Sequence, residues 1–250
     1  MSTSINLVDR GYRYLPGVFQ YSRGVAAEPG FAIHRVELEG RPNIQQGFDL
    51  IAQHLTAIGR PLQAFCHCEL RSPAPFSEDG FRNFNLQYVE TLKAWGIMLG
   101  MENPVARSNL CPRQSPPTEP CFYAFSYTVE QRMHLSPSFV ISGCGEAPEG
   151  KTNYHDYIVR CGDVSESALA EKADFVLNEQ ARRLAGLGFE WNDVTCTNVY
   201  TVHPLFASLT SEIQRRGAAR RGLTWHDCRP PVVDIEFEMD CRRVMLSQIK

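Results

Sequence analysis

The sequence lacks any apolar run near the roughly 18 residues that a membrane-spanning helix needs. Its first 17 residues contain no apolar core of the signal-peptide type. It also lacks an excess of either charge, with 25 Lys and Arg against 28 Asp and Glu, so nothing in the balance favours a polyanionic partner. We therefore expect a cytoplasmic protein that binds neither membrane nor nucleic acid.

The nine cysteines form no CxxC pair, and the histidines form no HxxxH pair. Cys66-His67-Cys68 looks like half of a metal site, but it lies in a segment typical of a strand. There Cys66 and Cys68 would share a face and His67 would point the other way. We interpret the two cysteines as small buried apolar residues, and expect reduced thiols and no metal site.

The first half of the chain combines strand patterns with two amphipathic helices. Apolar residues from Ile44 to Ile58 recur every three or four positions, with Asn43 as a plausible N-cap and Gly59 as a plausible stop. The expected elements are a hairpin over residues 19–40, helices over 43–59 and 77–98, and strands over 62–70, 105–110 and 121–129.

The second half repeats this order. Its expected elements are strands over 138–143, 194–202 and 232–244, a long helix over 165–187, and a short helix after Pro204. The long helices of the two halves end in LTAIG and LAGLG, whose last glycines are Gly59 and Gly188. This pattern indicates an internal duplication. We expect an α+β fold with domains at 1–132 and 133–250, each a mixed sheet with two helices on one face.

Short motifs in this order resemble the RidA/YjgF family, whose members are about one such half in length. The first half shows Tyr21-Ser22-Arg23-Gly24-Val25 and Pro104-Val105-Ala106-Arg107-Ser108; the second shows Phe139-Val140-Ile141-Ser142-Gly143 and Asp234-Ile235-Glu236. The resemblance implies a tandem member with two chorismate-mutase-like domains. It also implies a homotrimer, and a small carboxylate-bearing substrate. Neither half carries all the motifs, so the halves are expected to share a site.

The second half is also similar to the C-terminal part of the chorismatases, which are longer tandem members of the same superfamily. The similarity lies in His226-Asp227-Cys228-Arg229-Pro230, followed by the acidic segment VVDIEFEM. It implies a second possible activity, the hydrolysis of a vinyl ether.

Two arginines are candidates for binding the substrate carboxylate. A guanidinium can hold a carboxylate through two parallel hydrogen bonds, and the family resemblance implies this role for Arg107. The alternative for Arg107 is a surface or interface ion pair. Arg229, just before two prolines, is a possible second clamp. Its alternative is a structural pair with Asp227 or another carboxylate.

Three carboxylates, Asp234, Glu236 and Glu238, alternate along the expected last strand and would share one face. A solvated charged face is the simpler interpretation. If one of them lies in a half-buried cleft, burial and like charge would raise its pKa, and it could protonate carbon or orient water. We select Glu236 first and Asp234 second as catalytic candidates.

The remaining site candidates are Tyr21 and the segment Ser142-Gly143-Cys144. Tyr21 could donate its hydroxyl in catalysis or be an ordinary core tyrosine. Backbone N–H groups at Ser142, Gly143 and Cys144 could bind a carboxylate or polarise a carbonyl; a plain strand end is the alternative. The basic run over 214–222 has no interleaved aromatic residues, so it indicates a helix C-terminus rather than an RNA site.

Three functions remain open on this basis. The first is a cofactor-independent hydrolytic deaminase that acts on a carboxylate-bearing enamine or imine, of the amino-muconate or aminoacrylate type, and releases ammonia. The second is a chorismatase-like hydrolase that forms pyruvate. The third is a small-acid-binding protein without catalysis.

Overall fold

The computed structural model describes residues 3–131, 136–151 and 153–250. It has the mixed α+β composition expected from the sequence. The helices are α1 (Ile44–Ala57), α2 (Glu78–Ala94), α3 (Glu166–Gly186) and α4 (Ala207–Arg215). The strands are β1 (Ile5–Leu7), β2 (Tyr12–Leu15), β3 (Gly24–Ala27), β4 (Phe31–Glu37), β5 (Phe65–Arg71), β6 (Ala106–Pro112), β7 (Cys121–Glu130), β8 (Phe139–Gly145), β9 (Cys196–Tyr200), β10 (Thr224–His226), β11 (Cys228–Arg229), β12 (Glu238–Arg243) and β13 (Leu246–Ile249).

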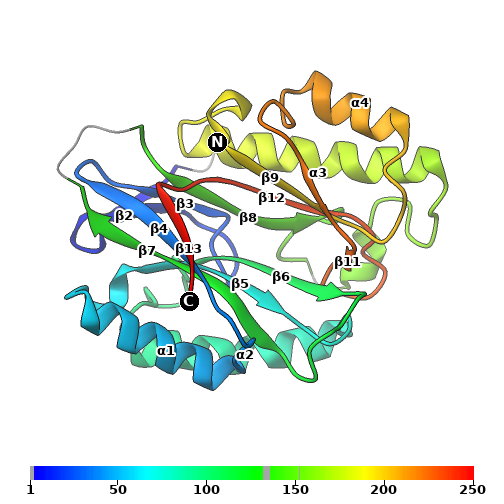
Figure 1. The fold of residues 1–250 in the computed structure, drawn as a ribbon. Helices are drawn as coiled ribbons and strands as arrows, with labels where there is room; N and C mark the ends of the chain where they lie inside the picture. The colour runs from blue at the N-terminus through cyan, green and yellow to red at the C-terminus, as the bar shows by residue number, and fades with distance from the viewer. Residues whose placement is uncertain (1–2, 132–135, 152) are drawn as a thin grey trace.

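The strands form two mixed sheets that lie between two pairs of helices (Figure 1). Strand order is β1-β2-β3-β8-β12-β9-β10 in the seven-stranded sheet and β11-β6-β5-β7-β4-β13 in the six-stranded sheet. Helices α1 and α2 bury their apolar stripes against the six-stranded sheet, and α3 and α4 bury theirs against the other. Two helices thus cover one face of each sheet, as expected.

The helix ends follow the local signals in the sequence. Asn43 caps α1 and forms a capping box with Gln46, while Ser77 and Ser165 cap α2 and α3 through their hydroxyls. Gly59 adopts a φ of 69° just beyond α1, a backbone conformation that suits glycine.

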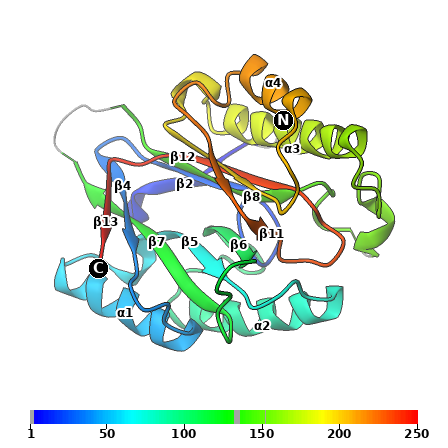
Figure 2. The same ribbon diagram turned by 45° about the vertical axis from the view of Figure 1, so that its right-hand side comes forward.

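The two sheets exchange strands between the halves of the chain. The expected hairpin over 19–40 is wrong, because β3 pairs with β2 and β8 whereas β4 pairs with β7 and β13. Strands from the start of the chain therefore extend the sheet of the second half. In return, β11 and β13 extend the sheet of the first half (Figure 2). The domain boundary expected between residues 132 and 133 lies outside the described residues.

Four consecutive strands of each sheet nevertheless pair in the same way. In the order β4-β7-β5-β6 the pairings are antiparallel, antiparallel and parallel, and the order β8-β12-β9-β10 gives the same three. A bulge in β5 changes the expected face of one cysteine. Cys66 packs between the sheets, whereas Cys68 packs toward α1 and α2, so the two do not share a face.

Polar and charged side chains lie buried between the sheets. Glu69 of β5 accepts hydrogen bonds from Arg35 at 2.6 and 3.0 Å and from Arg242 of β12 at 3.1 Å. Burial raises the pKa of Glu69, but the two guanidinium groups outweigh it and hold that pKa well below its usual range. This ion triad joins strands of the two sheets.

Candidate active site

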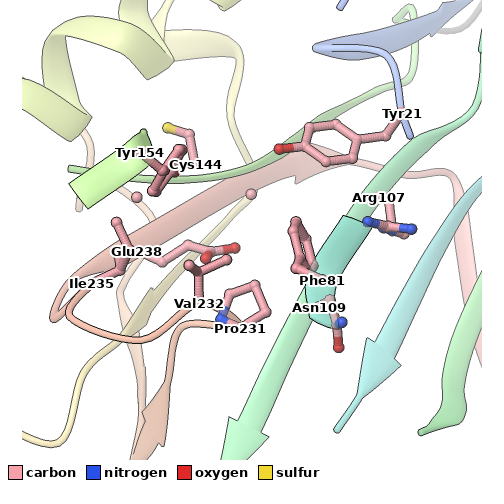
Figure 3. Close-up of a pocket in the computed structure, with 12 residues that line it drawn as sticks. Tyr21, Phe81, Arg107, Asn109, Cys144, Tyr154, Pro231, Val232, Ile235 and Glu238 are labelled. Carbon is pink, nitrogen blue, oxygen red and sulfur yellow. The ribbon is translucent and has the colours of Figure 1, made fainter. Parts of the chain in front are cut away.

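A pocket opens between the two sheets and takes residues from both halves of the chain (Figure 3). From the first half it receives Tyr21, Phe81 of α2, and Arg107 and Asn109 of β6. From the second half it receives Gly143, Cys144 and Gly145 of β8, Tyr154, Pro231, Val232, Ile235, and Glu238 of β12. The pocket is thus lined by both halves of one chain, and it is a candidate for the expected shared site.

Arg107 lies at one side of the pocket with an unused hydrogen-bonding group. The residue is only 2% exposed, and its Nη2 donates to Oδ1 of Asn85 at 2.6 Å. Its guanidinium carbon lies 4.8 Å from the ring centre of Tyr88 and 5.1 Å from that of Tyr21. Nη1 is buried without a partner among the described residues. An unpaired buried donor is costly, so this geometry suits an anionic ligand.

The pocket carboxyl is Glu238, not Glu236 or Asp234. Glu238 is the first residue of β12 and is 5% exposed. Burial first, and then the neighbouring Asp240, raise its pKa well above the usual range; Arg183 and Arg107 offset this only in part. A carboxyl with a raised pKa keeps its proton to a higher pH than an ordinary carboxyl and can act as a general acid.

The expected last strand over 232–244 is wrong at its beginning, and this changes the arrangement of the acids. Residues 232–237 form a loop with a positive φ of 69° at Asp234, so the three acids do not share a strand face. Glu236 accepts from Arg229 at 3.1 Å and lies 2.6 Å from Nε2 of His203. Arg229 therefore forms a structural ion pair, which was the alternative to its binding the substrate. Neither Arg229 nor Glu236 lines the pocket.

Asp234 lies in a second group of polar side chains outside the pocket. Its Oδ2 is 3.5 Å from Nε2 of His155, which is 3.3 Å from Sγ of Cys161. The three ligand-type atoms lie within 4.8 Å of one another. Among the described residues, this is the group whose donor atoms could suit a metal ion.

The backbone of strand β8 lies close to strand β6 at the pocket. Ser142 is fully buried and accepts from the N–H of Arg107 at 3.0 Å, while it donates to the carbonyl of Ser22 at 2.6 Å. The N–H of Gly143 donates to Ser108 Oγ at 3.2 Å. These two groups are thus engaged in holding β6 and β8 together, and Ser142 does not line the pocket.

Cys144 and Tyr21 line the pocket wall with protonated side chains. Burial raises the pKa of the Cys144 thiol to about 12, and its Sγ lies 3.2 Å from Nε2 of Gln180. A thiol with this pKa is a poor nucleophile at neutral pH. Burial also raises the pKa of Tyr21 well above its usual range. Its hydroxyl, which is directed into the pocket, can donate a hydrogen bond (Figure 3).

Gly143 leaves the space that the Glu238 carboxyl occupies. A Cβ at this position would lie 2.1 Å from Oε1 of Glu238. We expect Gly143→Ala to displace the carboxyl and to lower kcat by about 100-fold, the lower range for loss of a general acid. Steady-state kinetics and circular dichroism measure the effect. Wild-type kcat in this variant would contradict the role given to Glu238.

The fold resembles that of an enzyme of known structure. A chorismatase crystal structure superposes with a TM-score of 0.55 and 12% identity, over 91% of this chain and 78% of that one. This similarity shows the fold, and it extends over both halves rather than the second half alone. The E. coli YjgF gene product aligns over 47% of this chain and 87% of its own, with a TM-score of 0.32 and 17% identity.

Sequence relatives define the family. A model described as 2-aminomuconate deaminase CnbZ matches residues 4–248. A 2-amino-5-chloromuconate deaminase of Comamonas testosteroni is 48% identical over 233 residues, which are 93% of this chain and 93% of that protein. The chain belongs to the 2-aminomuconate deaminase CnbZ family. The expectation of an ammonia-releasing deaminase is thereby confirmed. No helix in the described ranges is long and apolar enough to cross a membrane.

Proposed function

We propose that the protein hydrolyses a small carboxylate-bearing enamine, or its imine tautomer, of the 2-aminomuconate type. The observation that carries this proposal is the shared pocket of Arg107 and Glu238. There Nη1 of Arg107 has no hydrogen-bond partner among the residues that the structure describes, and Glu238 is buried. The family relationship supports the deamination, and the pocket supports its hydrolytic form.

The reaction follows from the protonation states of these groups. Arg107 binds the substrate carboxylate next to the carbon that carries nitrogen. Glu238 transfers its proton to the enamine carbon, which gives an iminium ion. Water then adds to the iminium carbon and returns a proton to the Glu238 carboxylate. The hydroxyl proton of the resulting carbinolamine moves to its nitrogen, the carbon–nitrogen bond breaks, ammonia leaves, and a 2-oxo acid remains. None of these steps requires a cofactor.

The other pocket residues orient the substrate in this scheme. Tyr21 donates its hydroxyl to the nitrogen or to the added oxygen, and Cys144 contributes apolar wall. Ser142 and Gly143 act indirectly, since their hydrogen bonds hold together β6 and β8, two of the strands that form the pocket lined by Arg107 and Glu238.

We also propose that the chain is a tandem member of the RidA/YjgF superfamily with domains at 1–132 and 133–250. The same pairing order in β4-β7-β5-β6 and in β8-β12-β9-β10 supports this duplication. The homotrimer and the cytoplasmic location remain predictions.

The proposal is tested by incubating the purified protein with 2-aminomuconate in water enriched in ¹⁸O. We expect one ammonium ion per substrate molecule, and a 2-oxo acid that carries the label. Chorismate serves as the comparison substrate. Pyruvate from chorismate without ammonia from 2-aminomuconate would favour the chorismatase-like alternative, and binding of either acid without product would favour a non-catalytic protein.

A further inference from the structure

The pocket continues into a larger outer chamber. The inner part has a volume of about 40 Å³ and the outer part about 320 Å³. Tyr21, Phe81, Tyr154 and Val232 line both parts, so the two form one path from Arg107 to the surface. A six-carbon acid anchored on Arg107 therefore has to extend into the outer chamber, along mainly aromatic and apolar walls.

The outer chamber carries two cationic side chains, Arg82 of α2 and Lys151. Arg82 is exposed and has no hydrogen bond or ion pair with any residue in the described ranges. The Lys151 ammonium lies 5.4 Å from the ring centre of Tyr157, a weak interaction that leaves its N–H donors available. Both cations thus have capacity for an incoming anion.

The two acids of the chamber, Glu149 and Glu78, are already engaged elsewhere. Glu149 accepts hydrogen bonds from Arg23 at 3.0 Å and from Arg183 at 2.7 Å, so two guanidinium groups compensate its charge. Glu78 accepts from the backbone N–H of Tyr154 at 3.1 Å. The chamber therefore presents two uncommitted positive charges, whereas of its two acids only Glu78 has no cationic partner among the described residues.

We propose that Arg82 and Lys151 form a subsite for a second carboxylate, which selects an extended unsaturated diacid over a monoacid. One carboxylate binds Arg107 at the inner end, the chain of carbons lies between Tyr21, Phe81 and Tyr154, and the second carboxylate reaches the mouth. This inference rests on the proposed function, because it uses Arg107 as the inner anchor.

The test uses muconate and sorbate as unreactive probes. Both are linear six-carbon dienes, and sorbate has a methyl group where muconate has its second carboxylate. Calorimetry is expected to show that the wild-type protein binds muconate more tightly. In the double variant Arg82→Gln/Lys151→Gln this preference falls on the order of tenfold, the sum expected for two exposed charge pairs, while affinity for sorbate stays unchanged. Sorbate binding also shows that the variant is folded.

The matched control is Lys93→Gln, which removes an exposed cation from the last turn of the same helix, outside the chamber. It is expected to keep the wild-type preference. Equal affinities of the wild-type protein for the two probes, or an unchanged preference in the double variant, would overturn the subsite. Ammonia release from 2-aminomuconate is a separate measurement, so failure of the subsite and failure of the proposed function can be distinguished.

Discussion

Glu238→Gln is expected to lower kcat by about 100- to 10,000-fold, the range typical of losing a general acid. The amide fills the same space but cannot protonate the enamine carbon. Because burial and Asp240 raise the pKa of Glu238, the wild-type rate should hold through neutral pH and fall as the pH rises through that pKa. A pH profile of kcat/KM for the wild-type protein and the variant measures both effects.

Glu236→Gln is the matched control, since it makes the same change two residues away, outside the pocket lining. It is expected to keep kcat within about threefold of wild type, in line with a partly exposed ion pair. If Glu236→Gln abolishes turnover and Glu238→Gln does not, the candidate chosen from the sequence is correct and the pocket assignment is wrong.

The raised pKa of Glu238 predicts that Glu238→Gln stabilises the protein although it lowers kcat. A group whose pKa is raised by folding favours the folded state below its unfolded pKa, and this contribution is lost as the pH rises through the folded pKa. Glu238→Gln removes the cost of burying the ionised form. We therefore expect the inactive variant to melt at a higher temperature than wild type in alkaline buffer, with a smaller difference in acid buffer.

Arg107→Ala is expected to lower kcat/KM by about 100- to 1,000-fold. The variant loses the charged donor for the substrate carboxylate, and truncating one partner of a buried charge pair typically costs about 2–5 kcal/mol. The loss should appear mainly in KM and in the affinity for both muconate and sorbate. Steady-state kinetics and calorimetry measure it.

Arg107→Lys separates charge from geometry at the same position. It keeps a cation near the rings of Tyr88 and Tyr21 but cannot form two parallel hydrogen bonds. An intermediate affinity is expected. Full activity in Arg107→Ala would contradict any direct contact between this guanidinium and the substrate.

The sequence was sufficient for elements whose signals are local. The apolar stripe of α1, with Asn43 as its cap, and the starts of α2 and α3 next to Ser77 and Ser165 depend on residues a few positions apart. The fold class follows from these elements and their repetition. Arg107 is a candidate because its neighbours in the chain form a family motif, and the structure places it in the pocket.

Local sequence signals could not predict which strands pair with each other. Strands β3 and β4 are separated by a short turn, which favours a hairpin, yet β3 pairs with β8, more than 100 residues later. Such pairing depends on burial of both sheet faces rather than on the turn. Glu238 was missed for a similar reason, because an alternating acidic pattern does not show where the strand begins. Asp234 and Glu236 lie in the loop before Glu238 and do not line the pocket.

The exchange of strands between the sheets has a consequence for synthesis on the ribosome. The edge strand β13 is the last strand of its sheet in chain order and pairs with β4, while β3 pairs with β8. The six-stranded sheet is therefore incomplete until β13 has left the exit tunnel, and β3 has no β8 to pair with when it emerges. We expect nascent chains to keep both sheets open until β13 has been synthesised.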